Sequence, residues 1–281
     1  MPKQTPPPLA PVDPGTALIT GASSGLGAAF ARHLAQQGYR LVLTGRSVDA
    51  LAELAHTLES DYDATVETLP ADLSDDEDLQ RVVDRLCSPT HPVGFLINNA
   101  GVGVAEELHA SELDDELAML RLNVEVPLRL CHAVLPGLLR RGGRILNVSS
   151  VAALMPRGTY GASKSWLLAF SEWAHTRYRA EGVHVTALCP GPMRTQFHDR
   201  ARISLRRRPG WSFTDVDQVA LEGIAACQEG RAVHIPGRAA RVLSRVSRLA
   251  PSGVVERLAR TGVTATGSVD ATSTKRTERT S

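Results

Sequence analysis

The sequence has few cysteines, no long hydrophobic run and almost no net charge. Four cysteines occur among 281 residues, and none forms a C-x-x-C pair, so neither a zinc site nor a disulfide framework is indicated, and we expect reduced thiols. A formal net charge of +1 gives no reason to expect a nucleic-acid partner. No apolar run reaches the roughly 18 residues that a membrane-spanning helix needs.

Both ends of the chain differ in composition from its middle. Residues 1–14 are rich in proline and lack the apolar stretch of a secretory signal, while residues 261–281 are rich in Thr, Ser and Gly. We expect both segments to be disordered and, without a targeting signal, a cytoplasmic protein. The 43% apolar composition suffices for a full core. We therefore expect one folded domain over residues 15–260.

A glycine-rich turn follows the first apolar run. Residues 16–20 read as a strand, the turn occupies residues 21–27, and a helical pattern runs to residue 38. In such a turn the first glycine allows the tight bend, the second lets the backbone approach a pyrophosphate and the third allows close packing of helix and strand. This placement predicts a dinucleotide site built from Gly21, Ser23, Ser24, Gly25, Leu26 and Gly27.

The second predicted strand, residues 41–44, ends in Gly45-Arg46. An acidic residue at this strand end would bind the ribose hydroxyls of NAD and repel a 2′-phosphate. Glycine followed by arginine favours NADP(H) over NAD(H), because a guanidinium can hold a phosphate with two hydrogen bonds. The alternative is that Arg46 is an ordinary surface cation.

Helices and strands alternate along the rest of the chain. The patterns predict helices at 48–59, 75–86 and 113–140 and strands at 65–69, 95–97 and 144–148, with a last strand within 232–237. This order predicts an α/β fold with a single doubly wound parallel sheet, the Rossmann fold, with helices on both faces. Ligands bind at the carboxyl ends of such strands, where Asp72, Asn98, Ser150 and the Cys189-Pro190-Gly191 turn fall.

Tyr160 and Lys164 are four residues apart in a predicted helix and therefore share one face. We expect the ammonium to lower the pKa of the phenol from about 10 towards about 7, because a cation favours the phenolate. On an ordinary helix the same spacing places a packed tyrosine beside a solvated lysine.

Seven segments, in this order, resemble the short-chain dehydrogenase/reductase family over roughly residues 15–240. They are residues 20–27, Asp72-Leu73, Asn98-Asn99-Ala100-Gly101, Asn123, Val148-Ser149-Ser150, Tyr160-Gly161-Ala162-Ser163-Lys164 and Pro190-Gly191. The resemblance implies that Tyr160 is the acid/base and that Ser150 polarises the substrate carbonyl. It also implies that Lys164 holds the nicotinamide ribose and lowers the tyrosine pKa, and that Asn123 supports a proton-relay water.

The resemblance also implies cofactor contacts from residues beyond the glycine turn. These are Asp72 at the adenine, with Leu73, Asn99, Ala100, Gly101, Tyr160, Lys164, Pro190, Gly191 and Thr195. Structural alternatives remain: Asn123 could cap or brace a helix, Asp72 could cap the helix that begins near residue 74, and Ser149 could face the site in place of Ser150. Neighbouring residues at a strand end point in opposite directions, and the family pattern favours Ser150.

The sequence departs from the family pattern in two places, the loop before Tyr160 and the C-terminal end of the sheet. Tyr160 follows Ser150 by only ten positions, a shorter connection than the family usually has, which suggests a more open cleft. The Gly-Gly ending typical of tetrameric ketoacyl-carrier-protein reductases is missing. A lid at about 192–213 carries five arginines between residues 200 and 208, which could attract an anionic substrate or simply be solvated.

Basic amphipathic helices at about 238–260 could touch a membrane surface, although packing against the sheet or a second subunit is the commoner role of such helices. The family includes homodimers and homotetramers that pair through the helices near 111–141 and 157–181.

We therefore expect an NADPH-dependent oxidoreductase that reversibly reduces a ketone or 3-oxoacyl carbonyl to an alcohol and uses no metal. The alternatives are an epimerase or dehydratase of the extended branch of the same superfamily, and a redox sensor that binds a dinucleotide without catalysis.

Overall fold

The computed structural model describes residues 14–104, 106–154, 158–193 and 214–237. Four predicted features lie outside these ranges: the proline-rich arm, the arginine-rich lid with Thr195, the basic helices at 238–260 and the tail. Only Pro14 of the arm and Pro192 and Met193 of the lid are within the described ranges.

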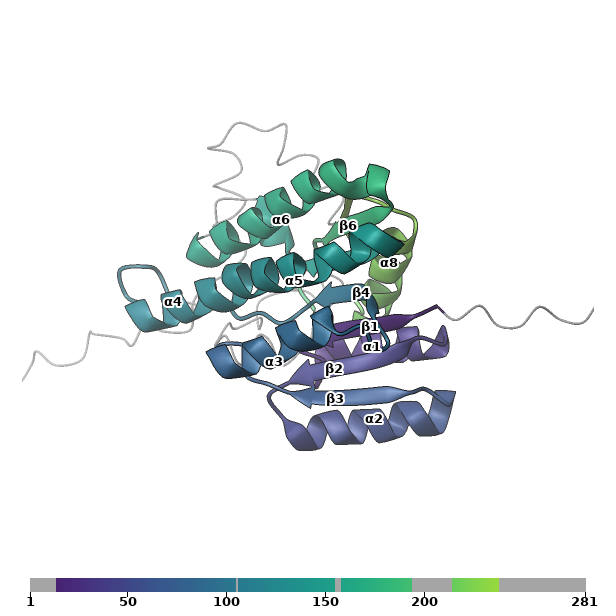
Figure 1. Cartoon of the computed structure of the whole chain (residues 1–281). Helices are drawn as coiled ribbons and strands as arrows, with labels where there is room; N and C mark the ends of the chain where they lie inside the picture. Colours follow the sequence, from purple (N-terminus) through teal and green to yellow (C-terminus); the bar gives the residue numbers. More distant parts are fainter. Residues whose placement is uncertain (1–13, 105, 155–157, 194–213, 238–281) are drawn as a thin grey trace, which may run out of the picture.

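One seven-stranded sheet forms the centre of the described structure (Figure 1), and every pair of neighbouring strands is parallel. The strand order is β3-β2-β1-β4-β5-β6-β7. The strands are β1 (Thr16–Thr20), β2 (Arg40–Gly45), β3 (Val66–Pro70), β4 (Val93–Asn98), β5 (Gly143–Val148), β6 (Val183–Leu188) and β7 (Val233–His234). The order reverses between β1 and β4, which makes the carboxyl ends of these two strands the expected place for a ligand.

Helices cover both faces of the sheet, which confirms the predicted doubly wound α/β fold. On one face lie α1 (Gly25–Gln36), α2 (Val48–Tyr62) and α8 (Val216–Gln228). On the other lie α3 (Asp76–Cys87), α5 (Val126–Arg141) and α6 (Gly158–Tyr178) (Figure 1). Short elements complete the set: α4 (Leu113–Leu120), a π-helical turn η1 (Arg121–Glu125) and 3₁₀ turns η2 (Val151–Leu154) and η3 (Arg179–Glu181).

The central strands are apolar on both sides because both faces are covered. In β4, Phe95 and Ile97 pack with α1 and α8, while Leu96 between them packs with α3 and α5. Each such side chain stabilises the fold by about 1.5–3 kcal/mol when fully buried. This two-sided core holds the strand ends in fixed positions.

The run predicted as one helix over 113–140 is interrupted, and this part of the prediction was wrong. A π turn over Arg121–Glu125 separates α4 from α5, and the N–H of Val126 reaches back five residues to the carbonyl of Arg121. The turn takes up one extra residue and buries Asn123.

Helix α3 begins at Asp76 and is capped by Asp75, whose carboxylate accepts the N–H groups of Glu77 and Asp78 at 3.0 Å each. Asp72 is therefore not the capping residue of this helix.

Among the helices of the described ranges, none is both long enough and apolar enough to cross a membrane.

Candidate active site

The point where β1 and β4 diverge is held by side chains that bridge the two strands. The hydroxyl of Thr20 accepts the backbone N–H groups of Asn99 and Ala100, both at 2.9 Å. The Asn99 amide donates to the carbonyl of Thr20 at 2.9 Å. These bonds fix Asn98-Asn99-Ala100-Gly101 beside the glycine turn. The sequence reasoning missed Thr20, although a hydroxyl that ends a buried strand just before a glycine turn was an available signal.

The glycine turn brings β1 and α1 into backbone contact. A Cβ at Gly27 would lie 2.1 Å from the carbonyl oxygen of Gly21, so only glycine fits there. Ser24 occupies the N-cap position of α1 but its side chain makes no capping hydrogen bond. The first N–H groups of an α-helix have no partner within the helix and attract anions. The start of this helix, with Gly25, Leu26 and the two serines before them, therefore fits a pyrophosphate.

The β2–β3 corner comprises Gly45, Arg46, Asp72 and Ser74. The N–H of Ala71 donates to the carbonyl of Gly45 at 3.0 Å, which joins the two strand ends. Asp72 accepts the N–H of Ser74 at 3.0 Å and its hydroxyl at 2.5 Å. Burial by itself would raise the pKa of the Asp72 carboxyl, but these two hydrogen bonds and the nearby Arg46 guanidinium lower the pKa overall. Arg46 is exposed, and Leu73 is buried beneath the corner.

The β5–α6 corner comprises Asn123, Ser150, Tyr160 and Lys164. Tyr160 lies in the first turn of α6, and its phenol forms a hydrogen bond with the Ser150 side chain. Lys164, one helical turn further on, donates from Nζ to the carbonyl of Val148 at 3.0 Å, and Nζ lies 5.9 Å from the centroid of the Tyr160 ring. The structure therefore brings together the three side chains that the sequence places at a strand end and a helix start.

The pKa of Tyr160 moves in the direction opposite to the one predicted. Burial raises the pKa of Tyr160 to about 12, and the hydrogen bond with Ser150, which works the other way, is the weaker effect. Burial also lowers the pKa of Lys164 to about 8, since the residue is only 4% exposed. The spacing of the two residues predicted their proximity but not their burial, and burial decides the sign. At neutral pH Tyr160 is a neutral phenol, able to donate a proton.

The two serines at the end of β5 have different partners. Ser149 is buried and donates to the carbonyl of Lys164 at 2.8 Å, which fastens α6 to the strand. Ser150 faces the phenol of Tyr160, and its hydroxyl also accepts the N–H of Ala152 at 3.1 Å. The geometry supports Ser150 as the serine of the site and makes Ser149 an anchor.

Asn123 is fully buried and braces the loop after β4. Its amide accepts the N–H of Val102 at 3.0 Å and donates to the carbonyl of Val102 at 2.8 Å and to Ser163 at 3.1 Å. The hydroxyl of Ser163 in turn donates to the carbonyl of Tyr160 at 2.8 Å. A Cβ at Gly101 would lie 2.9 Å from Oδ1 of Asn123 and 3.1 Å from Nζ of Lys164. Asn123 therefore joins the loop after β4 to α6, and only glycine fits between its amide and the ammonium of Lys164.

Pro190 and Gly191 follow β6 at the same edge of the sheet. The N–H of Val151 donates to the carbonyl of Pro190 at 3.0 Å, so η2 and this turn lie side by side. Pro190 is buried and Gly191 partly buried. In the described ranges no three His, Cys, Asp or Glu side chains are grouped so that they could hold a metal ion.

Comparisons with known proteins agree with this geometry. The sequence profile of the short chain dehydrogenase family matches residues 15–205. An uncharacterized oxidoreductase of Staphylococcus saprophyticus is 30% identical over 223 residues, 78% of this chain and 93% of that protein. Sulfoacetaldehyde reductase 2 of Chromohalobacter salexigens is 37% identical over 186 residues, 64% of this chain and 73% of that protein. A very-long-chain 3-oxoacyl-CoA reductase of Anas platyrhynchos is 31% identical over 184 residues, 62% of this chain and 58% of that protein.

Solved structures with either nicotinamide dinucleotide resemble the chain. A short-chain dehydrogenase from Sphingobium yanoikuyae in complex with NADPH superposes with a TM-score of 0.78 and 31% identity, covering 91% of this chain and 98% of the other. A short-chain dehydrogenase/reductase from Burkholderia phymatum in complex with NAD gives a TM-score of 0.73 and 27% identity, covering 85% of this chain and 94% of the other.

Proposed function

This chain belongs to the short-chain dehydrogenase family of oxidoreductases, and we propose that it reduces a ketone or 3-oxoacyl carbonyl to an alcohol with NADPH, in a reversible reaction. The observation that carries the proposal is the β5–α6 corner, where the Ser150 hydroxyl and the Tyr160 phenol are hydrogen-bonded to each other beside the anchored ammonium of Lys164.

The residues along the strand ends fit a nicotinamide dinucleotide. The start of α1, with Gly21, Ser23, Ser24, Gly25 and Leu26, would hold the pyrophosphate on its free N–H groups. Other residues would line the remainder of the cofactor, as the resemblance implies: Leu73, Asn99, Ala100, Gly101, Pro190, Gly191 and Thr195. When bound, the nicotinamide supplies the hydride that the substrate carbonyl carbon receives.

The side chains of the β5–α6 corner supply the rest of the chemistry. Ser150 donates a hydrogen bond to the substrate oxygen and orients it, and Tyr160 donates the proton that the developing alkoxide needs. General acid catalysis of this kind contributes about 10² to 10⁴ in rate. Lys164 is held at Val148, and its positive charge beside Tyr160 favours the phenolate that remains after proton transfer. Asn123 keeps the loop after β4 and the first turn of α6 at a fixed separation.

The β2–β3 corner supports a preference for NADPH over NADH. Gly45 has no side chain that would repel a 2′-phosphate. Arg46 follows the last residue of β2 and is exposed, so its guanidinium can reach a phosphate. Arg46 lies close enough to Asp72 to lower the pKa of its carboxyl, so at this corner a guanidinium would be available to the 2′-phosphate and a carboxylate to the adenine.

The substrate class rests on the relatives and on sequence features. The relatives include reductases of sulfoacetaldehyde and of very-long-chain 3-oxoacyl-CoA, both anionic carbonyl compounds. The arginines between residues 200 and 208 suit such substrates. The short connection between Ser150 and Tyr160 suits a cleft that is open to a large substrate.

The exposed side of α6 supports self-association. Trp166 stacks on Phe170 with centroids 5.2 Å apart, Trp173 follows at 5.9 Å, and Trp173 is 55% exposed. Aromatic side chains are enriched in protein interfaces. We propose a homodimer or homotetramer paired through this helix, for which sedimentation equilibrium is the test and a monomer at micromolar concentration is the contrary result.

The proposed function is tested by oxidation of NADPH and of NADH against a panel of ketones, sulfonated aldehydes and 3-oxoacyl thioesters. Faster turnover with NADPH on one class of the panel supports the proposal and names the substrate class. Binding of both dinucleotides without turnover would contradict the proposed substrates, and the absence of dinucleotide binding would contradict the function itself.

A further inference from the structure

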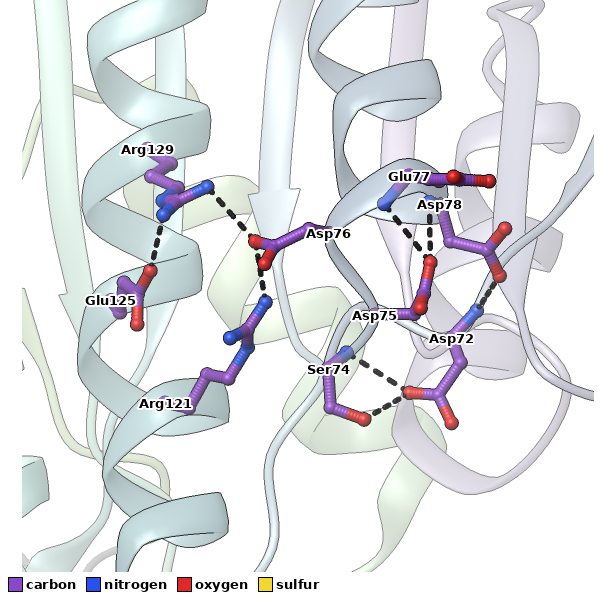
Figure 2. Close-up of polar contacts among 9 residues, drawn as sticks. All are labelled: Asp72, Ser74, Asp75, Asp76, Glu77, Asp78, Arg121, Glu125 and Arg129. Carbon is purple, nitrogen blue, oxygen red and sulfur yellow. Dashed lines mark hydrogen bonds and ion pairs between the residues drawn. The ribbon is translucent and has the colours of Figure 1, made fainter.

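Four consecutive acidic residues stand at the start of α3, the cap Asp75 and then Asp76, Glu77 and Asp78 of the first turn, and Asp76 reaches a different helix (Figure 2). Asp76 accepts hydrogen bonds on the same carboxylate oxygen from Arg121 at 2.7 Å and from Arg129 at 3.5 Å. Arg129 also pairs with Glu125 at 2.6 Å. Arg121 is the first residue of the π turn, and Arg129 lies in α5 beyond it.

The two arginines can share one acceptor because the π turn lies between them. Eight residues span about 2.2 turns of a regular α-helix, which would leave Arg121 and Arg129 about 80° apart around the axis. The π turn takes up one extra residue, so the same segment spans about 1.9 turns. The side chains of Arg121 and Arg129 therefore project from the same face of the helix. A carboxylate that binds both arginines therefore favours the π arrangement over the regular helix.

The π turn also sets the direction of Asn123, which stands at its middle. Conversion of the turn to a regular helix would rotate the residues on one side by about 100° relative to the other. The Asn123 side chain would then no longer form its hydrogen bonds with Val102 and Ser163. These hydrogen bonds fix the turn on the side that faces the site, while Asp76 fixes it on the opposite, exposed side of the helix.

We propose that Asp76, through Arg121 and Arg129, is a positioning residue for the reaction: it locks the π turn and so fixes Asn123 and the loop after β4 in the β5–α6 corner. The inference deepens the proposed function and rests on it for the activity measurement. Asp76 is 71% exposed on its side chain, so its contribution to global stability is small, and its effect falls on the geometry of the site.

The chain offers a closely matched control. Asp217 lies in the first turn of α8, where Asp215 is the N-cap, and pairs with Arg32 of α1 at 3.1 Å. Its side chain is 57% exposed. Asp217→Asn and Asp76→Asn thus each remove one negative charge from the first turn of a helix and break an exposed ion pair between helices, but only Asp76 is tied to the π turn.

The test compares the two variants in the full chain by backbone amide exchange over residues 119–126 without any ligand, by NADPH affinity, and by kcat on the carbonyl substrate that the panel provides. We expect Asp76→Asn to exchange faster over this segment and to lose about tenfold in kcat, since small misplacements of catalytic groups are costly. Its NADPH affinity stays within about twofold of wild type, and Asp217→Asn matches wild type in all three measurements. The unfolding midpoints of the two variants shift equally.

Two further variants sharpen the result. Arg121→Met should reproduce the Asp76→Asn effect without adding to it in the double variant, and Asp76→Glu, which keeps the charge, should recover most of the lost kcat. Equal exchange and equal kcat in Asp76→Asn and Asp217→Asn would overturn the inference. Wild-type protein without turnover on the panel would instead contradict the proposed function, and the ligand-free exchange measurement would still decide the role of Asp76.

Discussion

The β2–β3 corner and the β5–α6 corner lie at the same edge of one sheet but are built in different ways. Arg46 and Ser74 of the first are exposed, and both interact with the carboxylate of Asp72. Asn123 and Lys164 of the second are 0% and 4% exposed and bind backbone carbonyls and buried hydroxyls. Charge interactions are screened by salt at the surface and persist in the interior. The first corner should therefore tune affinity, and the second should decide whether the reaction proceeds.

The largest effect that separates the two corners is expected from Lys164→Met. Removing the ammonium beside Tyr160 should lower kcat by about a hundredfold or more. At pH 7 the same change should stabilise the fold, because a buried lysine whose pKa falls from 10.5 to about 8 costs about 3 kcal/mol as a cation. Loss of the hydrogen bond to Val148 reduces this stabilisation by about 1 kcal/mol.

The effect of Lys164→Met on stability should depend on pH. Between pH 8 and 10.5 the unfolded wild-type chain holds a proton on Lys164 that the folded chain has lost, so wild-type stability rises with pH in this window. The stability advantage of Lys164→Met should shrink over the same range in urea unfolding experiments. An advantage that stays constant from pH 7 to 10 would show that the lysine is not buried as a cation.

Asn123→Ala comes next. It leaves the N–H and carbonyl of Val102 without their partner, which costs about 1 kcal/mol for each of these partly buried groups, and it should lower kcat by about a hundredfold. Asn123→Asp keeps the acceptor for the Val102 N–H and should fall between wild type and alanine in both measurements. Full activity in Asn123→Ala would show that the loop after β4 needs no brace.

Arg46→Ala should have the smallest effect and should act on the cofactor alone. Loss of one exposed guanidinium is expected to raise the KM for NADPH about tenfold, to leave the KM for NADH within about twofold, and to matter less in 0.5 M salt. Arg140→Ala, at an exposed arginine of α5, is the control. An equal change for both dinucleotides would remove Arg46 from the phosphate site.

The sequence predicted those parts of the molecule that depend on local pattern. The strand ends, the glycine turn, the pairing of Tyr160 with Lys164 and the parallel sheet all follow from apolar periodicity and turn residues. Three features did not follow. The π turn is one extra residue inside a helical pattern that continues on both sides. The bridge from Thr20 to Asn99 joins strands 79 positions apart. The direction of the Tyr160 pKa depends on burial, which no local spacing reveals.

The measurement that tests the account most directly is a comparison of Tyr160→Phe with wild type for NADPH affinity and for kcat on a carbonyl substrate. The substitution keeps the ring and removes only the hydroxyl that bonds with Ser150. We predict an NADPH affinity within about threefold of wild type and a loss of about 10² to 10⁴ in kcat. A variant that keeps its turnover would show that Tyr160 does not donate the proton and would contradict the role assigned to the β5–α6 corner.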